Sequence, residues 1–172
     1  IRQISGAKVL GFRAPFLSIN KNHLWVFDIL KKHMTYDSSI FPVRTPLYGI
    51  PSAKRYPYSV SDINPLEETP NGNFTEIPLS TLRLPSIGNI PIAGGFYLRF
   101  LPTQLIKFGI KKLNNSNFPA VFYIHPKDLD PEMPRISGYN WTYYWNLKHA
   151  TKKFESILKN FKFSSIRDVI FE

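Results

Sequence analysis

The chain has 172 residues, of which 43% are hydrophobic and 15% aromatic, so it suits one folded domain and not a disordered polar chain. It has no cysteine, which excludes disulfide frameworks and thiolate metal sites. No apolar run approaches the ~20 residues that span a bilayer. The net charge of +10 comes from Lys and Arg spread in doublets, so we expect no membrane span and no nucleic-acid partner.

The first forty residues predict a strand, helix and strand in succession. Residues 1–6 are typical of a last helical turn closed by glycine, and residues 8–13 of a short strand. Asn20 or Asn22 then begins a mainly apolar helix, and a second strand lies near residues 36–40. This order indicates a parallel sheet.

Proline is dense and periodicity fails from residue 41 to 75, which we interpret as a proline-rich insertion. Residues 77–82 and 90–100 then predict strands, the second bent at its two glycines. A helix follows Pro102, and the apolar run 120–124 is typical of a buried strand. An amphipathic helix at 147–161 and a short helix after residue 165 complete the prediction.

Arg13 and His125 each follow a predicted parallel strand, so we expect them to share a cleft at the carboxyl ends of the strands. A histidine there can act as a general acid or base, and an arginine can orient a carboxylate. Taken alone, each residue fits a structural role better, as a packed histidine or a surface ion pair.

Residues 11–16, Gly-Phe-Arg-Ala-Pro-Phe, resemble the Arg-x-Pro-Tyr/Phe motif of NodB-like polysaccharide deacetylases, carbohydrate esterase family four. Residues 122–125, Phe-Tyr-Ile-His, resemble the Leu-x-Ile-His motif of that family. Other stretches resemble a bacterial, exopolysaccharide-associated branch with a C-terminal extension; they are residues 36–42, 48–51, 76–80, 94–97 and 122–130. The likeness runs from about residue 4 to 169.

This resemblance implies an α/β fold, a partial distorted (β/α) barrel of the deacetylase type that lacks its N-terminal strands. We expect residues 1–172 to be a single C-terminal portion of a deacetylase domain, with residues 41–75 inserted and 126–172 as the extension. Ile1 is not methionine, so we expect the missing N-terminal half of the same protein to precede it. Strand 8–13 would then have a free edge, and the isolated chain would be marginally stable.

The implied reaction is hydrolysis of N- or O-acetyl groups on a polysaccharide or oligosaccharide, with a divalent metal, expected to be zinc, in the full-length protein. By resemblance, His125 protonates the leaving group, Arg13 pairs with a catalytic-base aspartate, and Asp37 orients the histidine. The resemblance assigns the acetyl pocket to Pro15, Phe16 and Phe122.

The two family motifs that carry the base aspartate and the metal ligands would lie before Arg13, and nothing there matches them. His23, His33 and His149 lie in or beside predicted helices without metal-ligand spacing. We therefore expect this chain to bind no metal and to be inactive alone.

Two other interpretations stay open: a non-catalytic carbohydrate-binding or structural module derived from this fold, and a nucleic-acid-binding protein supported only by charge. The aromatic residues between 139 and 145 either stack on sugar rings or cover the barrel end, and we favour packing. No export signal is visible, which favours the bacterial cytoplasm.

Overall fold

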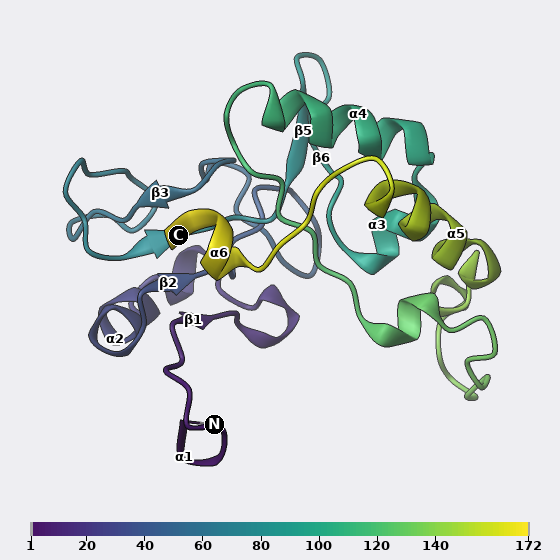
Figure 1. Ribbon diagram of the computed structural model, residues 1–172, viewed down its shortest axis with the longest axis horizontal. Helices are drawn as coiled ribbons and strands as arrows, with labels where there is room; N and C mark the ends of the chain where they lie inside the picture. The colour runs from purple at the N-terminus through teal and green to yellow at the C-terminus, as the bar shows by residue number, and fades with distance from the viewer. Residues whose placement is uncertain (1, 172) are drawn as a thin grey trace.

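The structure is a computed structural model that describes residues 2–171, and it shows a mixed α/β fold (Figure 1). One sheet has the strand order β1-β2-β4-β3. Its strands are β1 (Gly11–Phe12), β2 (Tyr36–Asp37), β4 (Thr75–Glu76) and β3 (Tyr58–Ser59). The first three are parallel, and β3 is antiparallel to β4. Helix α2 (Val26–His33) connects β1 to β2, which confirms the predicted strand–helix–strand unit.

Strand β1 lies at one edge of this sheet, as expected. Within residues 2–171 it pairs with β2 alone, and these residues form no closed ring of strands. The β1–β2 contact requires glycine at position 11, because a Cβ there would lie 2.0 Å from Cζ of Tyr36. The Tyr36 ring also stacks on Phe171, with centroids 5.6 Å apart. The short helix α6 (Ile166–Phe171) therefore packs back on the start of the sheet, as Figure 1 shows.

Strands β5 (Thr81–Leu84) and β6 (Gly88–Pro91) form an antiparallel hairpin. The predicted strand 90–100 is wrong beyond Pro91, because α3 (Gly95–Phe100) is a helix. Gly94 turns the chain with a φ of 109°, which interrupts the extended run. Gly95 packs against Asp128 so closely that a Cβ would lie 1.8 Å from its Oδ2.

The prediction of a strand at residues 120–124 is also wrong, because this segment is not a β-strand in the structure. It makes one strand-like backbone hydrogen bond, to Ser80. Ser80 donates its N–H to the Val121 carbonyl at 3.3 Å, and Val121 donates its N–H to Ser80 Oγ at 2.7 Å. A side-chain hydroxyl thus replaces the next backbone partner, and the preceding Pro119 has no N–H to extend a ladder.

The proline-rich stretch 41–75 is packed and not loose. It contains β3 and an isolated bridge between Val60 and Glu68. Ile50, Tyr58 and Phe74 are buried with residues of α2 and the sheet in one hydrophobic cluster.

Helices α4 (Thr103–Asn114) and α5 (Leu147–Leu158) confirm the two amphipathic predictions. They bury Ile106, Ile110 and Ile157 with the β5–β6 hairpin in a second cluster, at the other end of the molecule from α2 (Figure 1).

The remaining helices are α1 (Arg2–Ser5) and four short 3₁₀ turns: η1 (Pro15–Leu17), η2 (Lys21–His23), η3 (Pro126–Leu129) and η4 (Trp141–Tyr143). Among the described residues no helix is long and apolar enough to cross a membrane.

Candidate functional site

The segment after β2 holds the arginine that follows β1. Arg13 donates from Nε to the Ser38 carbonyl at 2.8 Å and from Nη2 to Ser38 Oγ at 2.6 Å. Ser38 Oγ in turn donates to the Ile77 carbonyl at 2.6 Å, and the Ala14 N–H donates to Ser39 Oγ at 2.8 Å. These contacts fix the guanidinium by neutral groups, and Arg13 forms no ion pair within residues 2–171.

Two carboxyl groups lie buried behind Arg13, at the paired ends of β2 and β4. Asp37 and Glu76 are partners in the strand register, and both are fully buried. Asp37 accepts hydrogen bonds from the Ser39 hydroxyl and N–H, whereas Glu76 Oε1 accepts one from the Ile40 N–H. Burial and the charge of Asp37 raise the pKa of Glu76 well above its usual range, and burial also raises the pKa of Asp37.

The carboxyl group of Glu76 has fewer hydrogen-bond donors than that of Asp37. Glu76 Oε2 is buried and receives no hydrogen bond from any donor in the described chain. Its interaction with Asp37 is a hydrogen bond only if one of the two carboxyls carries a proton. Asp37 accepts from the Ser39 hydroxyl, whereas Glu76 has no side-chain donor. Together with the raised pKa of Glu76, this favours a neutral Glu76 beside a charged Asp37. This charge and its neighbour act on Arg13, whose pKa is nevertheless lowered by burial.

Tyr123 connects Arg13 to His125. The Arg13 guanidinium carbon lies 4.9 Å from the centre of the Tyr123 ring, in cation–π geometry. Tyr123 Oη lies 2.8 Å from Nε2 of His125, and the two rings are steeply inclined at 71°. The structure therefore brings Arg13 and His125 to one end of the fold through a shared tyrosine. The histidine is exposed.

The structure does not bring Asp37, which was expected to orient His125, into contact with that histidine. Asp37 is bonded to Ser39 and paired with Glu76 inside the sheet, so the exposed imidazole takes Tyr123 as its partner. Sequence reasoning missed Tyr123 and Glu76. The signal for Tyr123 was its two-residue spacing from His125 in an extended run, which puts both on one face. The signal for Glu76 was an acid at the end of a buried strand.

Arg13 and Phe122 line a cavity of about 300 Å³ between β1, the segment 119–122 and the start of α6. Phe122 also stacks against Phe154 of α5 at 6.3 Å between centroids. Pro15 and Phe16 do not line this cavity and are exposed, Phe16 by 91%. Phe16 has a φ of 57°, in the left-handed region, which turns its ring away from the core. Three residues expected at one pocket are thus divided between a cavity and a surface turn.

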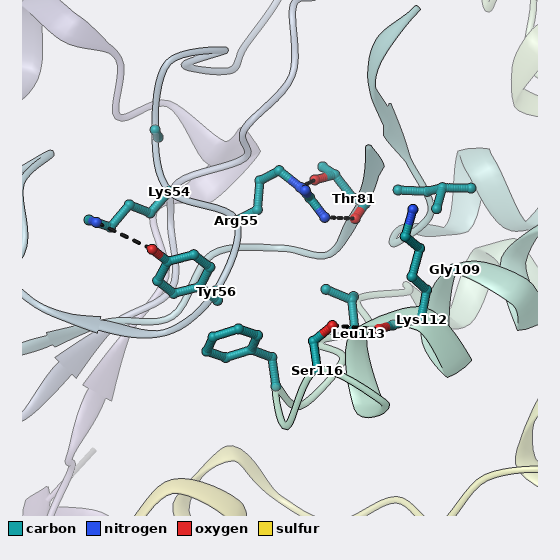
Figure 2. Close-up of a pocket in the computed structure, with 11 residues that line it drawn as sticks. Lys54, Arg55, Tyr56, Thr81, Gly109, Lys112, Leu113 and Ser116 are labelled. Carbon is teal, nitrogen blue, oxygen red and sulfur yellow. Dashed lines mark hydrogen bonds between the residues drawn. The ribbon is translucent and has the colours of Figure 1, made fainter. Parts of the chain in front are cut away.

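A second cavity of about 420 Å³ lies between the proline-rich stretch and α4 (Figure 2). Arg55 reaches across it and donates to Thr81 Oγ1 at 3.2 Å, while Tyr56 stacks on Phe118 with centroids 4.5 Å apart. Lys112 enters from α4. The lining groups mainly join the stretch 41–75 to the hairpin and α4, and neither Arg13 nor His125 reaches this cavity.

The described residues do not gather the donors of a metal site. No group of three or more His, Asp and Glu side chains that could hold an ion is found in residues 2–171. The oxygens of the buried Asp37–Glu76 pair accept from backbone N–H groups.

The fold and site define a mixed α/β domain in which a fixed arginine, a buried acid pair and an exposed histidine lie at one end. A family model described as a domain of unknown function, DUF3473, matches residues 38–171, which is more than half of the chain. The chain belongs to this family. Neither the curated proteins nor the solved structures gave a match.

Proposed function

We propose that this chain is the C-terminal part of a metal-dependent polysaccharide deacetylase, to which it contributes Arg13 and His125. The observation that carries the proposal is the Arg13–Tyr123–His125 arrangement, because it joins the two motifs that resemble the deacetylase family. DUF3473 is associated with the C-terminal regions of polysaccharide deacetylases, which supports the same assignment. The proposal includes a partial (β/α) barrel fold, an acetylated polysaccharide as the substrate, and a location in the bacterial cytoplasm.

His125 has the position of a proton donor. Its imidazole is exposed and contacts Tyr123 at Nε2, while its backbone N–H donates to Asp128 Oδ2 and its carbonyl accepts from the Asp128 N–H. A hydroxyl group can either donate to or accept from Nε2, so Tyr123 can support both the neutral ring and the imidazolium. In the proposed reaction, His125 gives a proton to the departing amine or alkoxide of the sugar.

The orientation of the Arg13 guanidinium is fixed, and no carboxylate among the described residues forms an ion pair with it. Its guanidinium is fixed by Ser38 and the Tyr123 ring, without a carboxylate partner within residues 2–171. In the proposal the anion that pairs with Arg13 is a base aspartate from a segment before Ile1, which would lie along the free edge of β1. The metal that the resemblance implies would take its ligands from that segment as well, since residues 2–171 contain no group of three donors that could hold it.

The proposal is tested by acetate release from an acetylated glucosamine oligomer. We expect the protein that carries this domain behind its upstream segment to release acetate, and a chelator to abolish the release. The isolated 172-residue chain should release none. If the longer protein binds the oligomer but releases no acetate under any metal supplied, the carbohydrate-binding module becomes the better interpretation.

A further inference from the structure

Six aromatic side chains, five exposed and one half-buried, gather in two groups of contacting rings, here called the aromatic platform. Its members are Phe96, Phe100, Tyr139, Trp141, Tyr143 and Trp145. Trp141 and Trp145 are 61% and 50% exposed and lie 5.5 Å apart between centroids at 85°. Phe100 links them to Phe96, at 5.9–6.0 Å from each indole and 4.2 Å from the Phe96 ring. Large rings at this exposure do not act as core packing, so the expectation that they cover the barrel end is not supported.

A buried arginine fixes the platform from below. Arg99 is 3% exposed, and its Nη1 donates to the carbonyls of Thr142, Tyr143 and Trp145 at 2.8, 3.1 and 3.0 Å. Arg99 Nη2 also pairs with Asp128 at 3.2 Å. An exposed loop with no backbone partners would be mobile, whereas three carbonyls on one buried cation hold the indoles in a set orientation. The rings are thus preorganised although they touch solvent.

The same contacts fix the platform relative to His125. Asp128 accepts from the His125 N–H at 3.2 Å and donates its own N–H to the His125 carbonyl at 2.9 Å. Lys127, in the same turn, places its Nζ 4.9 Å from the centre of the Tyr143 ring. The platform therefore continues from the candidate proton donor through η3, with basic side chains beside its rings.

We propose that the aromatic platform binds the sugar chain beyond the acetylated unit, as a polymer-holding surface next to His125; this inference rests on the proposed function. Sugar rings present C–H groups on one face, which pack on indole and phenol faces while the hydroxyls stay in water. Such a surface needs rigid, exposed rings at angles to one another, which the clamp by Arg99 provides. Lys127 and Arg135, which lie over Tyr143 and Tyr144, favour an acidic polymer over a neutral one.

Tryptophan fluorescence tests the inference, because the chain has three tryptophans and only Trp25 lies outside the platform. In a Trp25→Phe background, emission reports Trp141 and Trp145 alone. We expect an acetylated glucosamine oligomer and an acetylated polyuronate to change this emission, the polyuronate at lower concentration. A double variant, Trp141→Ala with Trp145→Ala, should weaken binding of either polymer by about tenfold in a pull-down on immobilised polymer.

Trp25→Ala is the matched control, since Trp25 is 59% exposed and lies next to α2. It should leave polymer binding unchanged. In the longer, active protein the double variant should raise KM for the polymer about tenfold and leave the hydrolysis of a small acetyl ester unchanged. Equal binding by the double variant, or a fluorescence response to anionic phospholipid vesicles and not to either polymer, would overturn the inference. If the double variant binds polymer equally well but acetate release is normal, the proposed function is unaffected and only the platform inference fails. If the polymer binds to the platform but no acetate is released, the proposed function fails and the platform inference is supported.

Discussion

The Arg99 guanidinium and the Asp128 carboxylate form a buried ion pair, with side-chain exposures of 3% and 4%. Arg99 belongs to α3, and Asp128 to the turn that follows His125. One contact thus joins the helix under the aromatic platform to the segment that carries the candidate proton donor.

Replacing Arg99 with methionine should lower the free energy of unfolding by about 3–5 kcal/mol, because Asp128 would be left as a buried charge without its partner. The three carbonyls of the loop 142–145 would also lose their donor. Urea denaturation of Arg99→Met and of the Arg99→Met/Asp128→Asn pair measures this. The double variant should recover part of the loss, and additive losses would show that the pair is not coupled.

Glu76→Gln should flatten the dependence of stability on pH. Burial and the charge of Asp37 raise the pKa of Glu76 in the folded chain well above the ordinary value of 4.5. Between the two pKa values the folded chain binds a proton that the unfolded chain has released, so the free energy of unfolding falls as pH rises from 4.5. An uncharged glutamine cannot ionise, and its amide can still donate to Asp37. Melting temperatures between about pH 5 and about pH 8 measure this slope.

The exposed Glu155→Gln variant of α5 is the control and should keep the slope of the original chain. If Glu76 were ionised in the folded chain, the Glu76→Gln substitution would reduce the free energy of unfolding most at high pH. That outcome would contradict the prediction.

Gly11→Ala should destabilise the β1–β2 contact by about 1–3 kcal/mol, the usual range for overpacking. The added Cβ would lie 2.0–2.6 Å from three atoms of the Tyr36 ring. Calorimetric unfolding of Gly11→Ala in the original chain and in a Tyr36→Ala background separates this clash from other effects of alanine. An equal cost in both backgrounds would mean that Tyr36 is not the obstacle.

The sequence predicted the features that depend on local pattern. The β1–α2–β2 unit, α4 and α5 follow from apolar spacing and from turn residues, and the placement of Arg13 after a parallel strand follows from the same unit. The helix at Gly95–Phe100 could not be predicted, because Gly95 is required by Asp128, thirty-three residues later in the chain.

The parts of the site that were missed depend on contacts across the fold. The raised pKa of Glu76 depends on the register of β2 with β4, which places Asp37 beside it and has no local signature in the sequence. The Tyr123 contact to Arg13 joins residues 110 positions apart. Exposure of the aromatic platform depends on Arg99, whose burial is unusual for an arginine and has no local signature.

The most direct test of the central claim compares His125→Ala with His149→Ala in the protein that carries this domain and its upstream segment. His149 is an exposed histidine of α5 with no place in the candidate site, so its variant should keep full activity. His125→Ala should lower kcat on an acetylated glucosamine oligomer by about 10²–10⁴-fold, but much less on an acetyl ester whose leaving group needs no proton. Equal kcat values for the two variants on the oligomer would contradict the claim that this domain supplies the proton donor.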